Sequence, residues 1–364
     1  MSTRLGRTTL DRRQFLGGMA GATAGVLFGG AGVLRAARRE VVVGGRRVKV
    51  VDGHAHCIVP EALDVLKDSP LSRAVSAALS APGRPLVITA DRLRQMDEQG
   101  IDVEVLSINP FWYSAERELA RQLIGVQNER LAALCAAHPG RLVALASVAL
   151  QHPDLAAIQL EDAVRKHGMR GAGIGGSVNG EELASARFDP FWAKAQELDA
   201  LIFIHPQGFP EIQTRVKGNG FLSNVIGNPL ETTVALSHLI FEGTLDRFPR
   251  LRICAAHGGG FLPSYAGRFD HGCLAFPANC TATNKKPPSE YLKQLYVDSL
   301  VFTPEGLRHL VAECGASHIV LGTDAPFPWT TTAVDHVLGT PGLSDADRIA
   351  MLGGNLISLL RIAG

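Results

Sequence analysis

Four short apolar runs, each ending in histidine or aspartate, are the feature that most constrains the fold of this 364-residue chain. The runs are rich in β-branched residues, as is typical of strands in a parallel sheet that is buried on both faces. Their polar ends are the pair His54 and His56, then His205, His257 and Asp324. Carboxyl ends of parallel strands meet at one edge or face of a sheet, so we expect these five side chains to lie together.

Apolar runs and amphipathic helical segments alternate eight times after residue 40, which predicts an α/β fold. The pattern favours a closed (β/α)8 TIM barrel over an open sheet. Residues 40–51, with a Gly44-Gly45 turn, predict an N-terminal β-hairpin before the first barrel strand. Three longer segments are predicted to be a loop or insertions, namely residues 57–90, 207–228 and 273–290.

Three imidazoles and a carboxylate predict a divalent metal site with an acid–base partner. His54 and His56 share one face of a strand because alternate residues do. Together with His205 and Asp324 they offer nitrogen ligands and one carboxylate, a set that suits zinc, with manganese as the alternative. Each histidine taken alone also fits a structural, hydrogen-bonded role at the end of a strand. The prediction therefore depends on all four positions occurring together.

Further motifs accompany the candidate ligands between about residues 48 and 360. They include Asp52-Gly53-His54-Ala55-His56, Asn228-Pro229-Leu230-Glu231, His257-Gly258-Gly259-Gly260 and Gly322-Thr323-Asp324-Ala325-Pro326. With these motifs the chain resembles the amidohydrolase superfamily, in the branch of aminocarboxymuconate-semialdehyde decarboxylase and γ-resorcylate decarboxylase. The resemblance implies a TIM barrel of the metal-dependent hydrolase type.

The resemblance also implies roles for single residues. It implies that His257 exchanges a proton with substrate or metal-bound water, which suits a group that titrates near pH 6.5, while Asp324 acts both as ligand and in catalysis. The alternative is that His257 is a further metal ligand. Two-metal amidohydrolases carry a bridging carboxylated lysine on the fourth strand. Residues 171–177 contain no lysine, which implies one metal.

Two departures from the aminocarboxymuconate enzymes bear on the substrate. Those enzymes have a tryptophan soon after the His-Pro of the fifth strand, where this chain has Gln207. They also extend an arginine from the partner subunit just before a proline, where this chain has Phe276. We therefore expect a more apolar or aromatic acid, contacts from both residues, and a homodimer. Arg84 is a candidate anchor for the substrate carboxylate, or a solvated loop residue.

The expected activity is a metal-dependent carboxy-lyase reaction that decarboxylates a small aromatic or unsaturated carboxylic acid. Hydrolysis of a lactone, ester or amide, or hydration, is the alternative, because activated water needs the same groups. A second alternative is an exported binding protein without catalysis. The chain carries 36 basic and 35 acidic residues, which gives no electrostatic case for nucleic acid as a partner.

Residues 1–39 predict a leader that is separate from the barrel at residues 40–364. Arg12-Arg13 followed by Phe15-Leu16 and a glycine-rich uncharged run resembles a twin-arginine export signal. We expect a periplasmic enzyme exported in folded form. A membrane anchor, for which the run is long enough, and a cytoplasmic location are the alternatives. The six cysteines have no spacing that indicates a disulfide pairing.

Overall fold

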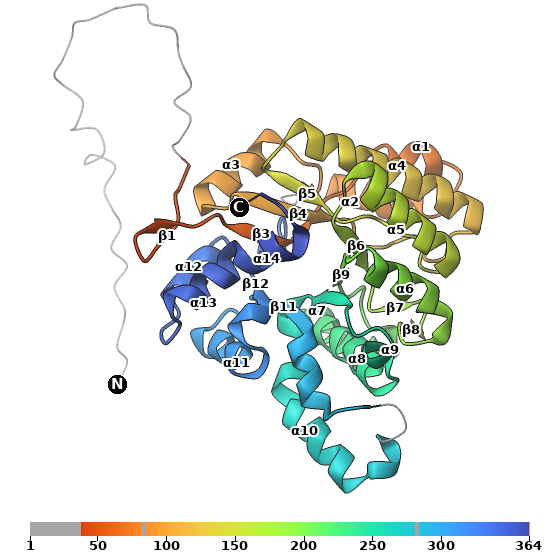
Figure 1. Cartoon of the computed structure of the whole chain (residues 1–364). Helices are drawn as coiled ribbons and strands as arrows, with labels where there is room; N and C mark the ends of the chain where they lie inside the picture. The colour runs from red at the N-terminus through yellow and green to blue at the C-terminus, as the bar shows by residue number, and fades with distance from the viewer. Residues whose placement is uncertain (1–37, 82–84, 281–283, 364) are drawn as a thin grey trace, which may run out of the picture. The chain divides into compact units, whose positions relative to one another are not determined.

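The computed structural model describes residues 38–81, 85–280 and 284–363, in which parallel strands alternate with helices (Figure 1). The strands form a three-stranded sheet in the order β3-β4-β5 and a five-stranded sheet in the order β12-β11-β10-β9-β6. Their bounds are β3 (Val51–His56), β4 (Val103–Ser107), β5 (Leu142–Ala144), β6 (Gly171–Ile174), β9 (Leu201–Ile204), β10 (Arg252–Ala255), β11 (Leu295–Asp298) and β12 (Ile319–Val320).

Backbone hydrogen bonds join the two sheets on both sides. Beyond β5, the N–H of Ala146 donates to the carbonyl of Gly171 in β6 over 2.8 Å. On the other side, the N–H of Gly53 in β3 donates to the carbonyl of Leu321, just after β12, also over 2.8 Å. Neighbouring strands therefore follow one another in chain order, which is the arrangement of the predicted (β/α)8 barrel.

Apolar side chains on the two faces of the strands form two separate clusters, one inside the barrel and one between the strands and the helices. The interior cluster contains Val103, Val105, Leu201 and Phe203. Residues of the last helix, such as Leu356, belong to the same cluster. Alternate residues of the same strands, such as Ile202 and Ile204, pack outward against the surrounding helices. Because His205 continues the alternation of Leu201 and Phe203, it faces the interior.

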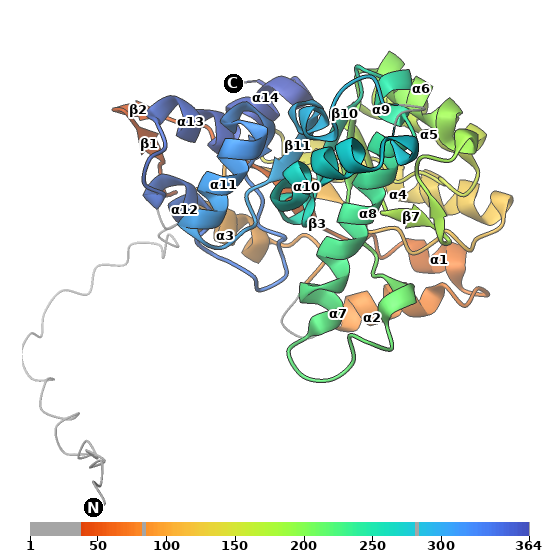
Figure 2. The same cartoon turned by 90° about the horizontal axis from the view of Figure 1, so that it is seen from below.

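The helices largely follow the sequence periodicity, with differences in the long connections. Residues 57–90 are not a plain loop, because they contain α1 and α2, and a helix follows β10 that the sequence pattern did not indicate. Figure 2 shows that α7, in the excursion after β9, projects from the body of the barrel. The bounds are α1 (Ala62–Leu66), α2 (Ser72–Ser80), α3 (Ala90–Gln99), α4 (Arg117–Ala137), α5 (Pro153–His167), α6 (Asp189–Glu197), α7 (Leu222–Val225), α8 (Gly227–Phe241), α9 (Thr244–Arg247), α10 (Leu262–Ala275), α11 (Pro304–Cys314), α12 (Ala333–Gly339), α13 (Asp345–Ile349) and α14 (Asn355–Leu360).

The N-terminal hairpin is present as β1 (Val42–Val43) and β2 (Arg46–Arg47), which pair in antiparallel register around the predicted Gly-Gly turn. Residues 1–37, with the twin-arginine motif, lie outside the described residues. The last two residues of the expected leader do contact the barrel. Arg38 pairs with Asp102, and Arg39 pairs with Asp335. Among the described helices, none has the length and apolar character needed to cross a bilayer.

A disulfide links Cys273 and Cys280, across the end of α10 and the turn that follows. The sequence spacing did not indicate this pair, because the two cysteines come together only where the chain reverses after the helix. Among the described residues, Cys57, Cys135, Cys254 and Cys314 are free thiols. Burial raises the pKa of Cys57 to about 12, so this thiol is protonated at neutral pH.

Candidate metal centre

A β-bulge in β3 turns both histidines of the first strand toward the barrel interior. Relative to β4, strand β3 contains one extra residue between Asp52 and Ala55. An extra residue reverses the alternation of faces along a strand. Val51, before the bulge, belongs to the interior cluster, and His54, within the bulge, and His56, beyond it, face the interior as well. Both histidine side chains are buried.

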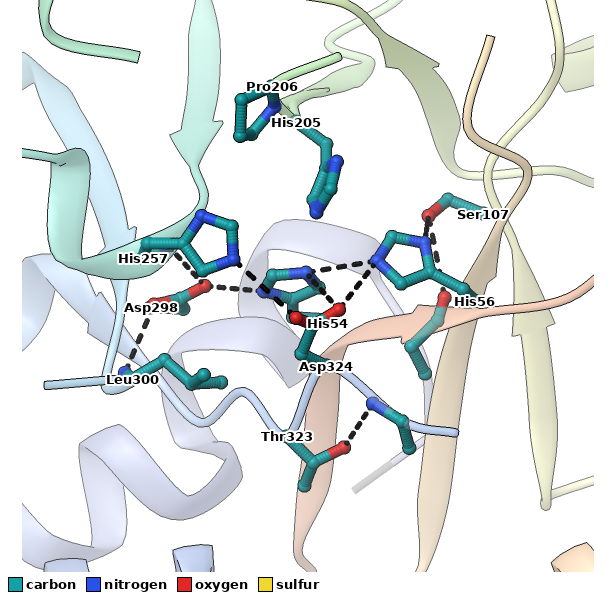
Figure 3. Close-up of polar contacts among 12 residues, drawn as sticks. His54, His56, Ser107, His205, Pro206, His257, Asp298, Leu300, Thr323 and Asp324 are labelled. Carbon is teal, nitrogen blue, oxygen red and sulfur yellow. Dashed lines mark hydrogen bonds and ion pairs between the residues drawn. The ribbon is translucent and has the colours of Figure 1, made fainter. Parts of the chain in front are cut away.

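Nε2 of His54, Nε2 of His56 and Oδ1 of Asp324 form a small triangle (Figure 3). The two nitrogens are 3.1 Å apart, and the carboxylate oxygen is 3.3 Å from His54 and 3.0 Å from His56. Ligand atoms about 2.1 Å from a shared ion are about 3.0–3.4 Å from one another in octahedral and tetrahedral geometry. The triangle therefore has the size of one face of a metal coordination shell.

His205 points at this triangle from the carboxyl end of β9 (Figure 3). Its ring centroid is 4.6 Å from that of His56 and 5.0 Å from that of His54. The side chains of His205 and Asp324 are both buried, yet three of their polar atoms have no hydrogen-bond partner within the described part of the chain. These atoms are the two ring nitrogens of His205 and Oδ1 of Asp324. Unsatisfied buried polar atoms are costly, so these atoms fit a bound cation.

His257 approaches the other oxygen of the Asp324 carboxylate. Its Nε2 is 3.6 Å from Oδ2, and Figure 3 shows His257 and His56 on opposite sides of this carboxylate. Ligand atoms of His54, His205, His257 and Asp324 also lie within 4.8 Å of one another. By distance alone, either His56 or His257 completes a four-residue ligand set, so both assignments made from the sequence remain compatible with the geometry.

The turn that carries His257 explains its glycines. His257 has φ +55°, and the three glycines that follow also have positive φ, a region in which residues with a side chain are strained. A Cβ at Gly260 would lie 2.2 Å from the carbonyl oxygen of Pro229, and one at Gly258 would lie 2.7 Å from Val301. Close packing within the protein therefore accounts for these two glycines without contact to a substrate.

Asp298, the last residue of β11, holds two parts of the site together. Its Oδ2 accepts hydrogen bonds from Nδ1 of His54 over 2.6 Å and from the N–H of His257 over 2.9 Å, while Oδ1 accepts from the N–H groups of Gly258 and Leu300. A carboxylate at Nδ1 places the ring proton there and leaves Nε2 free to bind metal. The sequence analysis did not identify Asp298 as a site residue, although it ends an apolar run (residues 295–298) as the other candidate residues do.

In the metal-free protein, the ionised carboxylates of Asp298 and Asp324 balance the charge of a protonated His54. Burial lowers the pKa of His54, but Asp324 and Asp298 outweigh burial and raise it to about 10. Burial lowers the pKa of His56, and burial together with the other histidines lowers that of His205. Burial acts to raise the pKa of Asp324, yet the neighbouring histidines hold it well below its usual range. An ionised Asp324 beside neutral His56 and His205 suits a metal ion, and His54 joins this set when the metal displaces its proton.

A cavity of about 470 Å³ opens beside His205 and Asp324. Gln207 lines it, as expected for a substrate contact, although its side-chain amide donates to the carbonyls of His205 and Pro206. Phe276 does not reach this cavity within the chain: it follows α10, is 65 % exposed, and lines a separate hollow with Phe241 and Phe269. Arg84 lies outside the described residues.

Residues 51–362 match the amidohydrolase family model. The chain is 32 % identical over 272 residues to 2-amino-3-carboxymuconate-6-semialdehyde decarboxylase of Dictyostelium discoideum, covering 74 % of this chain and 75 % of the relative. It is 31 % identical over 301 residues to gamma-resorcylate decarboxylase of Rhizobium radiobacter, covering 77 % and 89 %.

A solved structure with the same fold is dihydroxybenzoic acid decarboxylase from Polaromonas sp. JS666, with bound manganese and the inhibitor 2-nitroresorcinol. The TM-score is 0.75 at 28 % identity, covering 86 % of this chain and 97 % of that structure. The chain belongs to the amidohydrolase family, in the branch that contains these decarboxylases.

Proposed function

We propose that this chain is a metal-dependent carboxy-lyase that removes CO₂ from a small aromatic carboxylic acid. The observation that carries the proposal is the cluster of His54, His56, His205 and Asp324 at the carboxyl ends of barrel strands, beside a cavity with aromatic walls. Decarboxylase activity in relatives that cover most of the chain supports the same reaction.

A single divalent ion held by His54, His56, His205 and Asp324 is our proposed cofactor. His56 is preferred to His257 as the fourth residue because it approaches the same carboxylate oxygen as His54, whereas His257 approaches the opposite one. When bound, the ion would act as a Lewis acid toward substrate oxygens. The three nitrogen ligands favour zinc, and manganese is the alternative that occurs in a related structure.

The remaining groups suit a proton transfer to the ring. Decarboxylation breaks the bond between the ring carbon and the carboxylate, leaves the electron pair on the ring, and requires a proton at that carbon. We assign His257 to deliver this proton, and we assign the ionised Asp324, whose Oδ2 is 3.6 Å from Nε2 of His257, to orient that ring. The side chain of His257 is 15 % exposed, in contrast to the buried His54, and it lines a second hollow that shares Asn228 and Trp329 with the cavity, so it can exchange protons there.

The test is a panel of hydroxybenzoates and muconate-type acids with protein reconstituted separately with Zn²⁺ and Mn²⁺. We expect CO₂ release and the matching phenol, both abolished by a chelator and restored by one equivalent of metal. Esters and lactones form the second arm of the panel. Turnover of esters or lactones without CO₂ from any acid would overturn the proposal in favour of hydrolysis, and absence of bound metal would overturn it in favour of a binding protein.

For residues 1–39 we propose a twin-arginine leader that exports the folded enzyme to the periplasm. The Arg12-Arg13 pair and the glycine-rich run support it. The Cys273–Cys280 disulfide is independent support, because disulfides persist mainly in oxidising compartments. Replacing both arginines with lysine should leave the protein in the cytoplasm with these two thiols reduced and activity intact. An unaltered protein found wholly in the cytoplasm would contradict export, and one retained in the membrane fraction would indicate an uncleaved anchor.

We also propose a homodimer in which the segment after α10 meets a second copy of the chain. Leu274 and Phe276 support it, since they are 79 % and 65 % exposed, unusually high for large apolar side chains. Sedimentation should give twice the chain mass for the unaltered protein and the monomer mass for Leu274→Ser with Phe276→Ser. A monomeric unaltered protein at micromolar concentration would contradict the proposal.

A further inference from the structure

Residues 209–225, which include α7, form a segment beside the cavity that has few polar ties to the rest of the barrel. Just before this segment, the Glu231 carboxylate accepts hydrogen bonds from the N–H groups of Gln207 and Gly208. Within the described residues, every hydrogen bond of residues 209–225 joins near neighbours in the chain, and none of their charged side chains takes part in an ion pair. Side-chain packing therefore holds this segment against the barrel.

One packing contact joins Phe221, in this segment, to Trp329, in the loop after β12. Their rings are stacked, with centroids 6.3 Å apart and planes 17° apart. Both rings line the cavity beside the metal centre, although Phe221 is 59 % exposed. Asn224, from α7, lines the same cavity and also the second hollow beside His257. The stack therefore holds a wall of both spaces in place.

Two phenylalanines with strained backbones meet this tryptophan. Phe221 has φ +54° and ψ +38°, and Phe302, after β11, has φ +58°. A bulky side chain is strained in this left-handed region. The ring centroid of Phe302 is 6.0 Å from that of Trp329. Strained residues persist only where their surroundings fix them, and they cluster at lids and switches. Contact with Trp329 therefore offsets the strain, and loss of that contact lets the backbone relax.

We propose that Trp329 is a positioning residue that latches a lid. Its stack with Phe221 holds residues 209–225 over the cavity, and separation of the two rings opens the cavity for substrate and product. Gly208 and Gly220 have φ +105° and +88°, which glycine adopts without strain, so they serve as the hinges of this lid. The inference rests on the proposed metal-dependent function, because the lid closes over that site.

Fluorescence quenching tests the latch without any substrate. The chain has three tryptophans, of which Trp112 and Trp192 are fully buried. Trp329 is partly exposed, so a collisional quencher such as acrylamide acts mainly on its indole ring. Phe221→Ala should raise the Stern–Volmer quenching constant at least about twofold, whereas Phe221→Tyr, which retains the ring, should leave it unchanged. Unchanged quenching in Phe221→Ala would overturn the latch.

Tyr265→Ala is the matched control for this experiment and the next. Tyr265 is 53 % exposed in α10, and the described linings of the cavity and of the hollow beside His257 do not include it. The substitution removes an exposed aromatic ring of similar size without touching the lid. It should therefore change neither the quenching constant nor the rates of metal exchange.

Metal exchange tests whether the same contact controls access to the metal centre. With zinc-loaded protein and dipicolinate as chelator, Phe221→Ala should raise the rate constants of zinc removal and zinc uptake by the same factor, at least about fivefold. The dissociation constant of zinc should stay the same, because a lid changes access and not the ligands. A higher dissociation constant, or unchanged rates at normal zinc content, would contradict the lid.

Steady-state kinetics separate positioning from chemistry. With the best acid of the hydroxybenzoate panel, Trp329→Leu should raise KM at least about fivefold and keep kcat within about twofold, because an open lid weakens binding of substrate and transition state alike. Trp329→Phe, which keeps an aromatic ring, should restore most of the loss. A lower kcat at unchanged KM would assign Trp329 to the chemical step and overturn the proposal.

Failure of the lid and failure of the proposed reaction give different results. If no acid releases CO₂ but Phe221→Ala alters both quenching and zinc exchange, the lid stands and the carboxy-lyase reaction fails. If CO₂ is released and Phe221→Ala alters neither quenching nor zinc exchange, the reaction stands and the lid is wrong.

Discussion

Nδ1 of His54 and Oδ2 of Asp298 are 2.6 Å apart, and neither side chain is exposed to solvent. The same carboxylate accepts hydrogen bonds from the backbone N–H groups of His257, Gly258 and Leu300. One residue of β11 thus fixes the orientation of a candidate ligand from β3 and of the turn that carries the candidate proton donor. A shift of the His54 ring or of the His257 turn would therefore change the distance between the metal site and the candidate proton donor His257.

Asp298→Asn should weaken metal binding. The amide retains one acceptor oxygen for the four donors and brings an N–H group toward Nδ1 of His54, so the ring is no longer held with Nε2 toward the metal. Loss of such an orienting carboxylate typically costs about 10–100-fold in metal affinity. Competition with a fluorescent chelator measures it, and excess metal should restore part of the activity. Asp68→Asn, on an exposed side chain, is the control. Unchanged affinity would remove Asp298 from the metal centre.

His54→Ala and His257→Ala should separate metal binding from proton transfer. His54→Ala removes a ligand and should lose both bound metal and turnover. His257→Ala should keep one metal per chain and lose about 10²–10⁴-fold in kcat, the usual contribution of general acid–base catalysis. Elemental analysis and kinetics provide the two readouts, with His138→Ala as the control. A metal-free His257→Ala protein together with a metal-bound His56→Ala protein would exchange the roles we assign.

Metal affinity should rise with pH because metal and proton compete for His54. With its pKa raised to about 10 in the metal-free protein, protonated His54 stabilises the fold at pH values below about 6.5, and this contribution is lost as pH rises through about 10. The neutral imidazole is the form that binds metal. Between about pH 7 and pH 9 we expect the dissociation constant of the metal to fall about tenfold per pH unit. Calorimetry in buffers of different ionisation enthalpy should detect the released proton, and a pH-independent constant would contradict this.

Glu231→Gln should loosen the segment after β9 while leaving the metal in place. The buried Glu231 carboxylate accepts hydrogen bonds over 2.7 Å from the N–H groups of both Gln207 and Gly208. Burial raises the pKa of Glu231 to about 7, and above that pH each hydrogen bond to the charged carboxylate is worth about 1.5–3 kcal/mol. We expect faster tryptic cleavage at Arg215 and lower kcat/KM, with unchanged metal content. Glu129→Gln, on an exposed face of α4, is the control. Equal cleavage rates would show that this carboxylate does not secure the segment.

Local sequence signals were sufficient for much of the barrel. Helix α3 (Ala90–Gln99), for example, ends at Gly100, which has φ +78°, and a glycine directly after an amphipathic run is a local signal for the end of a helix. The residue types that meet at the metal centre were also predicted from the sequence. Periodicity, turn residues and helix-terminating glycines depend on interactions within a few residues, which is why the chain displays them directly.

Residues far apart in the sequence required the folded chain. The bulge in β3 that turns His54 and His56 inward exists only relative to strand β4, and alternation along β3 alone gives no sign of it. The role of Asp298 depends on a contact 244 residues away in sequence, with His54. Only the folded structure shows that His56 approaches Oδ1 of Asp324 and that His257 approaches Oδ2. The packing of whole strands, and not the neighbouring residues in sequence, sets the pairing register and the distances between these side chains.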